Sequence, residues 1–375
     1  MLSDYLPWIV AVIVVLALVI GGFVMNRVAP EVTAPLRRRR PRPHRGHFRS
    51  GEEQESPVRR AAVIINPTKF TDLRPVRERI TAFSRANGWG EPVYLETTAD
   101  DTGAGQAAAA LRDGVDLVCT LGGDGTVRNV ASVLVGTEMP LGILPAGTGN
   151  LLARNLDLPV GLEAALTVAL TGRNRRIDVG ELRIGSADPV PDVDSEPAAD
   201  EVGLGPQTHH FLVMSGIGMD AAIMAGTNEN LKKKVGWPAY LLSGAKHLIS
   251  PEFRVNVWVD DEPEFRRRSR MVVIGNCGRL LGGLVLMPSA LVDDGRLDAV
   301  IASPRGLVGW VPVATRVATR QRKGHPTLDH KVCTEIRVVV DRPVPVQVDG
   351  DVLGEATEVT AVVRRAALTV RVSQT

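Results

Sequence analysis

Two glycine-rich turns hold the residues of this sequence that are best suited to chemistry. The first reads GGDGT over residues 122–126, and the second reads PAGTGN over residues 145–150. Glycine lets a backbone approach a ligand closely, and the free N–H groups of a following helix favour an anion at the same place. No Gly-Lys-Ser/Thr follows either turn, so neither is a Walker P-loop. Together the turns predict a phosphate-binding cradle at the carboxyl edge of a parallel sheet.

Asp124 places an acid in the first turn. A carboxylate in a phosphate cradle repels the ligand unless a cation lies between the two groups. Carboxylate oxygens suit Mg²⁺, so we expect Asp124 to hold magnesium. The alternative is a pair of tight turns without a ligand. It is disfavoured because glycine, acid and capping residues recur where a nucleotide would need them.

The segments around these turns alternate between strand and helix patterns. We expect strands at 61–65 and 92–96, and helices at 72–87, 106–113 and 162–170. Such alternation is typical of a parallel sheet with helices on both faces. The first half is therefore predicted to be a doubly wound α/β domain.

After residue 178 the pattern changes to strands separated by turns. The expected strands are 181–184, 211–214, 253–259, 271–274, 296–301, 335–340, 344–348 and 367–372. One helix is expected at 235–249. Residues 186–208 carry six acids and four prolines without apolar periodicity, which predicts a disordered loop. The second half is predicted to be antiparallel and β-rich.

The amino terminus begins with an apolar segment. Residues 8–25 include 18 residues without a charge, about 27 Å as a helix and enough to cross a bilayer. No basic residue precedes them, unlike a signal peptide, and Arg27 follows them. By the positive-inside rule we expect one uncleaved transmembrane helix in the cytoplasmic membrane, with the catalytic part in the cytoplasm. The arginines of Arg37–Arg49 would meet the anionic membrane surface rather than nucleic acid.

The predicted order is an anchor at 1–26, a basic disordered linker at 27–58, an α/β domain at 59–178 and a β-rich domain at 179–375. A return of the final strand to the first domain is left open, as is a homodimer.

The chain has 44 basic and 42 acidic residues, so its formal charge is near neutral. Three cysteines are far apart in apolar runs, and we expect reduced core residues: Cys119, Cys277 and Cys333.

Seven stretches resemble the diacylglycerol kinase catalytic-domain family, bacterial lipid kinases related to sphingosine and ceramide kinases. In the family's order they are INP at 65–67, GGDGT at 122–126, residues 145–154, RIDVG at 176–180, GIGMDA at 216–221, PSA at 288–290 with DDGRLD at 293–298, and VDGD at 348–351. The resemblance runs from about residue 59 to the end. It implies a nucleotide-binding α/β half and a lipid-binding β-sandwich half, with ATP and a membrane lipid meeting in the cleft between them.

The resemblance also implies roles for single residues. Those that would bind the nucleotide are Asn66, Gly122, Gly123, Gly125, Thr126, Gly147, Thr148, Asn150 and Asp351. Asp124 and Asp178 match acids linked to Mg²⁺ through water. Asp349 matches the general base, with Asp124 as its rival. Three more acids match a second, structural metal site of the family: Asp293, Asp294 and Asp298. The alternative is that they form an ordinary turn before a strand and bind no metal.

Two positions depart from the family's pattern. Leu151 stands where an acid commonly follows the asparagine of the second turn, and sphingosine kinases also lack that acid. Asp351 stands where the family has glutamate. Both departures bear on the choice of lipid and on metal geometry.

The leading hypothesis is a membrane-anchored lipid kinase that uses ATP and Mg²⁺ to convert diacylglycerol to phosphatidic acid. A sphingosine-type kinase is one alternative. An NAD kinase shares the Gly-Gly-Asp-Gly motif, but the second turn, the late Asp-Gly-Asp and the anchor disfavour it. A catalytically inactive lipid-binding protein has support only from Leu151.

Overall fold

Strand β1 (Ala61–Ile65) lies at the centre of a parallel sheet. All five of its residues are apolar and buried, as expected for a strand covered on both faces. It pairs in parallel with β2 (Val93–Glu96) and β3 (Leu117–Gly122), and β3 pairs in parallel with β4 (Leu141–Pro145). The computed structural model describes residues 58–185, 207–218, 251–280, 285–304, 309–310 and 328–374. All of these except Val58 belong to one compact unit.

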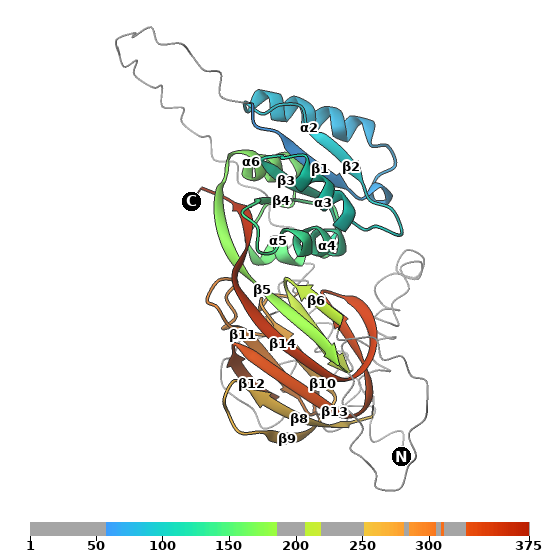
Figure 1. Ribbon diagram of the computed structural model, residues 1–375, viewed down its shortest axis with the longest axis vertical. Helices are drawn as coiled ribbons and strands as arrows, with labels where there is room; N and C mark the ends of the chain where they lie inside the picture. The colour runs from blue at the N-terminus through green and yellow to red at the C-terminus, as the bar shows by residue number, and fades with distance from the viewer. Residues whose placement is uncertain are drawn as a thin grey trace, which may run out of the picture. The chain divides into compact units, whose positions relative to one another are not determined.

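Helices cover both faces of this sheet (Figure 1). One face packs against α2 (Arg74–Ala86) and α6 (Leu162–Thr171) through the odd-numbered residues of β1. The even-numbered residues pack on the other side with α3 (Ala104–Arg112), α4 (Asp124–Leu134) and α5 (Leu151–Asn155). Side chains alternate across a strand, so β1 supplies both cores. The doubly wound α/β arrangement predicted from the sequence is confirmed.

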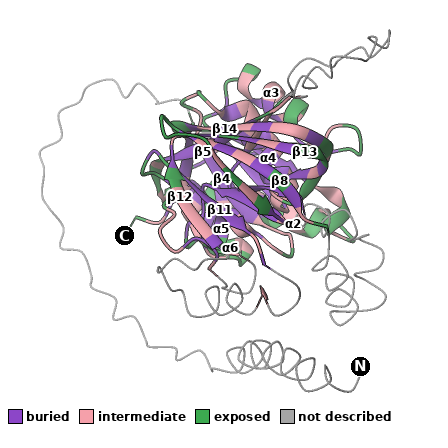
Figure 2. Ribbon diagram, turned by 90° about the horizontal axis from the view of Figure 1, so that it is seen from below, coloured by how far each residue is buried: buried purple, intermediate pink, exposed green. Residues whose placement is uncertain are grey.

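The carboxyl-terminal half is a β-sandwich, as predicted. Its strands are β5 (Arg173–Gly185), β6 (Gln207–Phe211), β7 (Met214–Gly218), β8 (Phe253–Val259), β9 (Phe265–Ser269), β10 (Met271–Gly275), β11 (Leu297–Ala302), β12 (Leu328–Cys333), β13 (Glu335–Val348) and β14 (Asp351–Val372). Neighbouring strands here are antiparallel, in the order β12-β11-β10-β7-β13-β14, with β8 also on β13 and β5 also on β14. Many buried apolar side chains of these strands form a cluster of their own, while others, such as Met271 and Val300, belong to the cluster that includes the even-numbered residues of β1. All six residues of β11 are buried, and the strand is drawn in purple in Figure 2.

Strand β14 joins the two halves (Figure 1). It pairs antiparallel with β13 and β5, and near its end Val370 pairs in parallel with Leu141 of β4. The register of its pairing with β5 shifts between Arg364 and Leu368, and Ala366 in this interval has a positive φ of 47°. The last strand of the sandwich therefore also extends the parallel sheet.

The chain bends between β6 and β7, where we predicted one strand at 211–214. Strand β6 ends at Phe211, Leu212 and Val213 form a bend, and β7 begins at Met214. All four residues are apolar, so the pattern contains no signal for a break. A further difference is that residues 207 and 208 of the expected loop 186–208 belong to β6. The expected helix 235–249 lies outside the described residues and stays a prediction.

The prediction of a single-pass membrane protein is corrected at this point. Within the described part of the chain, every helix is too short or too polar to span a bilayer. The predicted localisation, with an anchor in the cytoplasmic membrane, is therefore not carried further. The apolar segment 8–25 and the arginines of Arg37–Arg49 lie outside the described residues.

Candidate active site

The two glycine turns pack directly against each other at the carboxyl ends of β3 and β4. The N–H of Ala146 donates to the carbonyl of Gly122 at 2.8 Å. A Cβ placed on Gly147 would lie 2.7 Å from the Cα of Gly123. No side chain fits at that distance, so glycine is needed where the two turns meet. The sequence analysis predicted a cradle of this kind, and the structure brings its two parts together.

Asp124 ties the first turn to the second. It is the first residue of α4, and its Oδ1 accepts a hydrogen bond from the N–H of Leu151 at 2.6 Å. Burial raises the pKa of the Asp124 carboxyl, while the backbone N–H groups of Leu151 and Asn150 act in the opposite direction. Residue 151 therefore contacts Asp124 through its backbone N–H, and a leucine provides this donor as well as an acidic residue would.

Asn150 stabilises the second turn from within. Its φ is 48°, a left-handed conformation that asparagine tolerates better than most residues. Its Oδ1 accepts from the N–H of Gly147 at 3.0 Å, and its Nδ2 donates to the Gly147 carbonyl at 2.8 Å. The side chain therefore fixes the shape of the turn. Thr148 is exposed at the tip of the same turn.

The remaining predicted nucleotide-binding residues surround the first turn. Asn66 follows β1 and caps the short 3₁₀ helix η1 (Pro67–Lys69), where its Oδ1 accepts from the N–H of Thr68 at 3.1 Å. Thr126 is buried, and its side chain fills the space that a Cβ on Gly122 would occupy. A Cβ on Gly125 would lie 3.3 Å from Oδ2 of Asp351.

Asp349 comes from the opposite half, in the turn between β13 and β14. Its Oδ2 accepts from the N–H of Leu212 at 2.8 Å, and its Oδ1 accepts from the N–H groups of Val213 and Met214, both at 2.9 Å. The bend between β6 and β7 leaves these three N–H groups free to converge on one carboxylate. Burial raises the pKa of Asp349 to about 6, although the three donors and the charge of Arg128 lower it.

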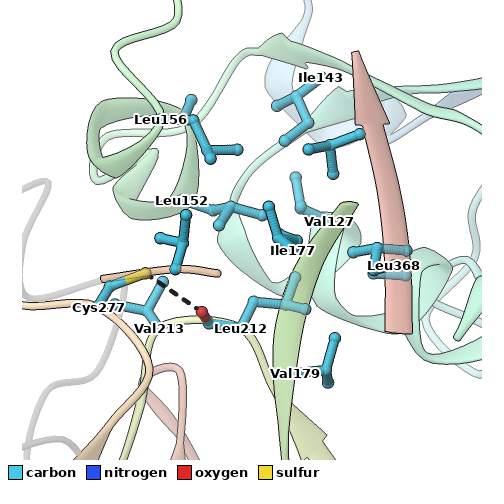
Figure 3. Close-up of a cluster of buried hydrophobic side chains, with 14 of the residues drawn as sticks. Val127, Ile143, Leu152, Leu156, Ile177, Val179, Leu212, Val213, Cys277 and Leu368 are labelled. Atoms are coloured by element: carbon cyan, nitrogen blue, oxygen red, sulfur yellow. Dashed lines mark hydrogen bonds between the residues drawn. The ribbon is translucent and has the colours of Figure 1, made fainter. Parts of the chain in front are cut away.

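Asp124 and Asp349 line the same cavity. Its other walls are apolar and come from both halves: Val127, Leu151, Leu152, Leu212 and Val213. The cavity has a volume of about 10 Å³, roughly room for one water molecule. Figure 3 shows Val127 and Leu152 packed with Leu212 and Val213 in one cluster, where the thiol of Cys277 donates to the Leu212 carbonyl at 3.4 Å.

Arg128 is a residue that the sequence analysis missed. It is buried, and its Nη2 donates to Oδ2 of Asp351 at 2.6 Å, which links α4 to the start of β14. Residues four apart share one face of a helix, so Arg128 lies one turn beyond Asp124 on the same side. That spacing was the available signal. The partner was not predictable because Asp351 follows 223 residues later.

The other predicted metal ligands have protein partners of their own. Asp178 is buried, and its two oxygens accept from the N–H groups of Gly295 at 2.6 Å and Ala366 at 2.7 Å. These bonds hold the Asp-Asp-Gly turn against the shifted part of β14. Asp178 does not line the cavity with Asp124 and Asp349.

The acids around that turn also lie outside the cavity. Asp293 pairs with Arg175 at 2.7 Å. Burial, together with the like charges of Asp298 and Asp178, raises the pKa of Asp294. Asp298 contacts Nε2 of His330 at 2.6 Å. Among the described residues, no three His, Cys, Asp or Glu side chains are grouped so that they could hold a metal, and these metal assignments stay predictions.

The three cysteines are free and buried, as predicted. Burial raises the pKa of the Cys119 thiol to about 12. A thiol with so high a pKa stays protonated at neutral pH and behaves as a small core residue.

Two family models match the chain in the order of its halves. The diacylglycerol kinase catalytic domain matches residues 60–182, and the YegS C-terminal NAD kinase beta sandwich-like domain matches residues 212–372. A diacylglycerol kinase of Staphylococcus saprophyticus is 25% identical over 306 residues, which cover 79% of this chain and 90% of that protein.

A further relative and a solved structure agree with these matches. A protein of Pseudomonas fluorescens named Probable lipid kinase YegS-like is 32% identical over 255 residues, 67% of this chain and 76% of that protein. The crystal structure of a diacylglycerol kinase from Bacillus anthracis has the same fold, with a TM-score of 0.60, 19% identity, and coverage of 84% of this chain and 98% of that one. The chain therefore belongs to the diacylglycerol kinase catalytic-domain family, and it is a lipid kinase.

Proposed function

We propose that this lipid kinase transfers the γ-phosphoryl group of ATP to the free hydroxyl of diacylglycerol and so produces phosphatidic acid. The observation that carries the proposal is that one acid from each half, Asp124 and Asp349, lines a single cavity. Diacylglycerol is proposed because relatives that cover most of the chain are named for it.

Asp349 is the proposed general base. With a pKa of about 6 it is mostly ionised at pH 7, and it is a stronger base than an ordinary aspartate. Its Oδ2 accepts one backbone N–H where a carboxylate oxygen can accept about two hydrogen bonds. The remaining acceptor position suits the lipid hydroxyl, whose proton moves to Oδ2 as the oxygen attacks phosphorus. The three N–H donors hold the carboxylate in place.

The glycine turns and Asp124 fit a nucleotide with a divalent cation. The contact of Gly147 with Gly123 leaves backbone where side chains would otherwise block a phosphate. Asp124 in the cavity wall offers carboxylate oxygens of the kind that bind Mg²⁺, and burial disfavours its negative charge unless a cation is near. We propose that Asp124 holds Mg²⁺ through water and that Asn66 and Thr126 support the nucleotide. Bound there, Mg²⁺ would offset the charge that develops on the phosphoryl oxygens.

The test is transfer of labelled phosphate from ATP to a panel of diacylglycerol, monoacylglycerol, sphingosine, ceramide, phosphatidylinositol and NAD. The proposal expects labelled phosphatidic acid, formed at least tenfold faster than any other product. If sphingosine or NAD is labelled faster than diacylglycerol, that acceptor is the substrate and the proposal of diacylglycerol is wrong. Lipid binding without transfer to any of these acceptors would mean that the protein binds lipid but is inactive.

A further inference from the structure

Arg128 is a buried cation whose hydrogen bonding is incomplete. It is 9% exposed, its Nη2 donates to Asp351, and its Nε is buried without a partner. An N–H of a buried guanidinium that lacks an acceptor costs free energy, because the charge has left water without compensation. An acceptor supplied by a bound ligand would remove this cost.

The surroundings of Arg128 place it beside the cavity. Burial raises the pKa of Asp349, which lines the cavity, and the charge of Arg128 opposes that rise; burial and then the charge of Arg128 lower the pKa of His209 on β6. The residue before Arg128, Val127, is part of the cavity wall. Nε2 of His209 is likewise buried without a partner. Arg128 on α4 and His209 on β6, two elements that contact each other, therefore each carry a buried nitrogen without a partner.

Asp351 occupies the position that an anionic ligand would take. Its Oδ2 lies against Gly125 in the first turn of α4, where the free N–H groups and the helix dipole favour negative charge. The Asp351 side chain is 54% exposed, whereas that of Arg128 is 11% exposed. Since only the acid is anchored loosely, it is the partner that can leave.

We propose that Arg128 binds the transferred phosphoryl group, and that its ion pair with Asp351 is the contact that this group replaces when ATP binds. The inference rests on the proposed function, because it concerns the same site. A guanidinium matches phosphate oxygens with two parallel N–H bonds, and Nε and Nη2 form such a pair. Asp351 thus acts as a stand-in anion in the free protein, which differs from the nucleotide-binding role that the resemblance to the family implied for it.

The experiment compares binding of Mg-ATP and Mg-ADP by calorimetry in wild type, Arg128→Gln and Asp351→Asn. Arg128→Gln should weaken ATP binding about tenfold or more and change ADP binding less than threefold, because only ATP carries the γ-phosphoryl group. Asp351→Asn should tighten ATP binding, since it removes the competing carboxylate. Arg85→Gln is the matched control, because Arg85 on α2 forms an exposed ion pair with Glu91 away from the cavity.

The opposing account is that Arg128 and Asp351 only connect the two halves. In that case both variants would weaken ATP and ADP binding equally and lower the Tm together, and the double variant would be no worse than either. That result overturns the inference, as does Arg128→Gln binding ATP like wild type.

Phosphate transfer to diacylglycerol is measured on the same preparations. Transfer by wild type together with unchanged ATP binding in Arg128→Gln would refute the role of Arg128 and leave the proposed function intact. If wild type phosphorylates no lipid, the proposed function fails, and the ratio of the ATP and ADP dissociation constants still decides whether Arg128 meets the γ-phosphoryl group.

Discussion

The pH dependence of catalysis should report the ionisation of Asp349. Burial raises the pKa of this carboxyl from 3.8 to about 6, and a general base works only when it is deprotonated. With a pKa of about 6, roughly one-eleventh of the protein carries the ionised base at pH 5 and roughly ten-elevenths at pH 7. The kcat/KM for lipid should therefore rise about tenfold over this interval. If the base had the ordinary pKa of an aspartate, its ionised fraction, and with it kcat/KM, would change by less than about a tenth over the same interval.

The assay follows labelled phosphate transfer to diacylglycerol in mixed micelles at constant ionic strength. ATP and Mg²⁺ are kept saturating, so that titration of the nucleotide does not enter kcat/KM for the lipid. Asp349→Asn is the control, and its residual activity should show no rise between pH 5 and pH 7. A flat wild-type profile would refute the reasoning. A rise that persists in Asp349→Asn but disappears in Asp124→Asn would transfer the base role to Asp124, whose pKa burial also raises.

Three further predictions concern the turns and the acids. Gly147→Ala should weaken ATP binding at least tenfold, because the new Cβ would lie 2.7 Å from the Cα of Gly123. An unchanged ATP affinity by calorimetry would show that the glycine turns do not bind the nucleotide. Asp178→Asn should cost about 1–3 kcal/mol of unfolding free energy in urea melts, since an amide can accept from only one of the two N–H groups that the carboxylate holds. Its kcat per folded protein should stay within threefold, and a large loss of kcat at unchanged stability would instead support a metal role. Chelation with EDTA should abolish transfer and Mg²⁺ should restore it, whereas full activity in EDTA would exclude the proposed cation.

Local pattern was sufficient to predict the nucleotide half. The apolar run 61–65 is buried on both faces, so its strand character is visible in composition alone. The glycine turns were equally visible as motifs, and the close backbone approach demands glycine at 147. The strand patterns and the turn motifs are each contained in a short stretch of sequence, so they can be recognised without knowledge of distant contacts.

The site residues of the β half depend on distant partners, and there the sequence was less informative. The resemblance to the family pointed to Asp349, but not to the bend at Leu212 and Val213, whose N–H groups it binds across more than 130 residues. A run of apolar residues predicts a continuous strand whether or not a distant carboxylate interrupts it. The pairing of Arg128 with Asp351 is long-range in the same way.

The most direct test of the account is kcat for Asp349→Asn and Asp124→Asn at saturating Mg-ATP, each normalised to folded protein. Asparagine keeps the size of Asp349 and can hydrogen-bond the lipid hydroxyl but cannot take its proton. Loss of a general base typically costs about 10²–10⁴-fold, so Asp349→Asn should keep at most about a hundredth of kcat while binding ATP within threefold of wild type. If it keeps more than about a tenth of kcat while Asp124→Asn loses all activity, Asp349 is not the base and the central claim is contradicted.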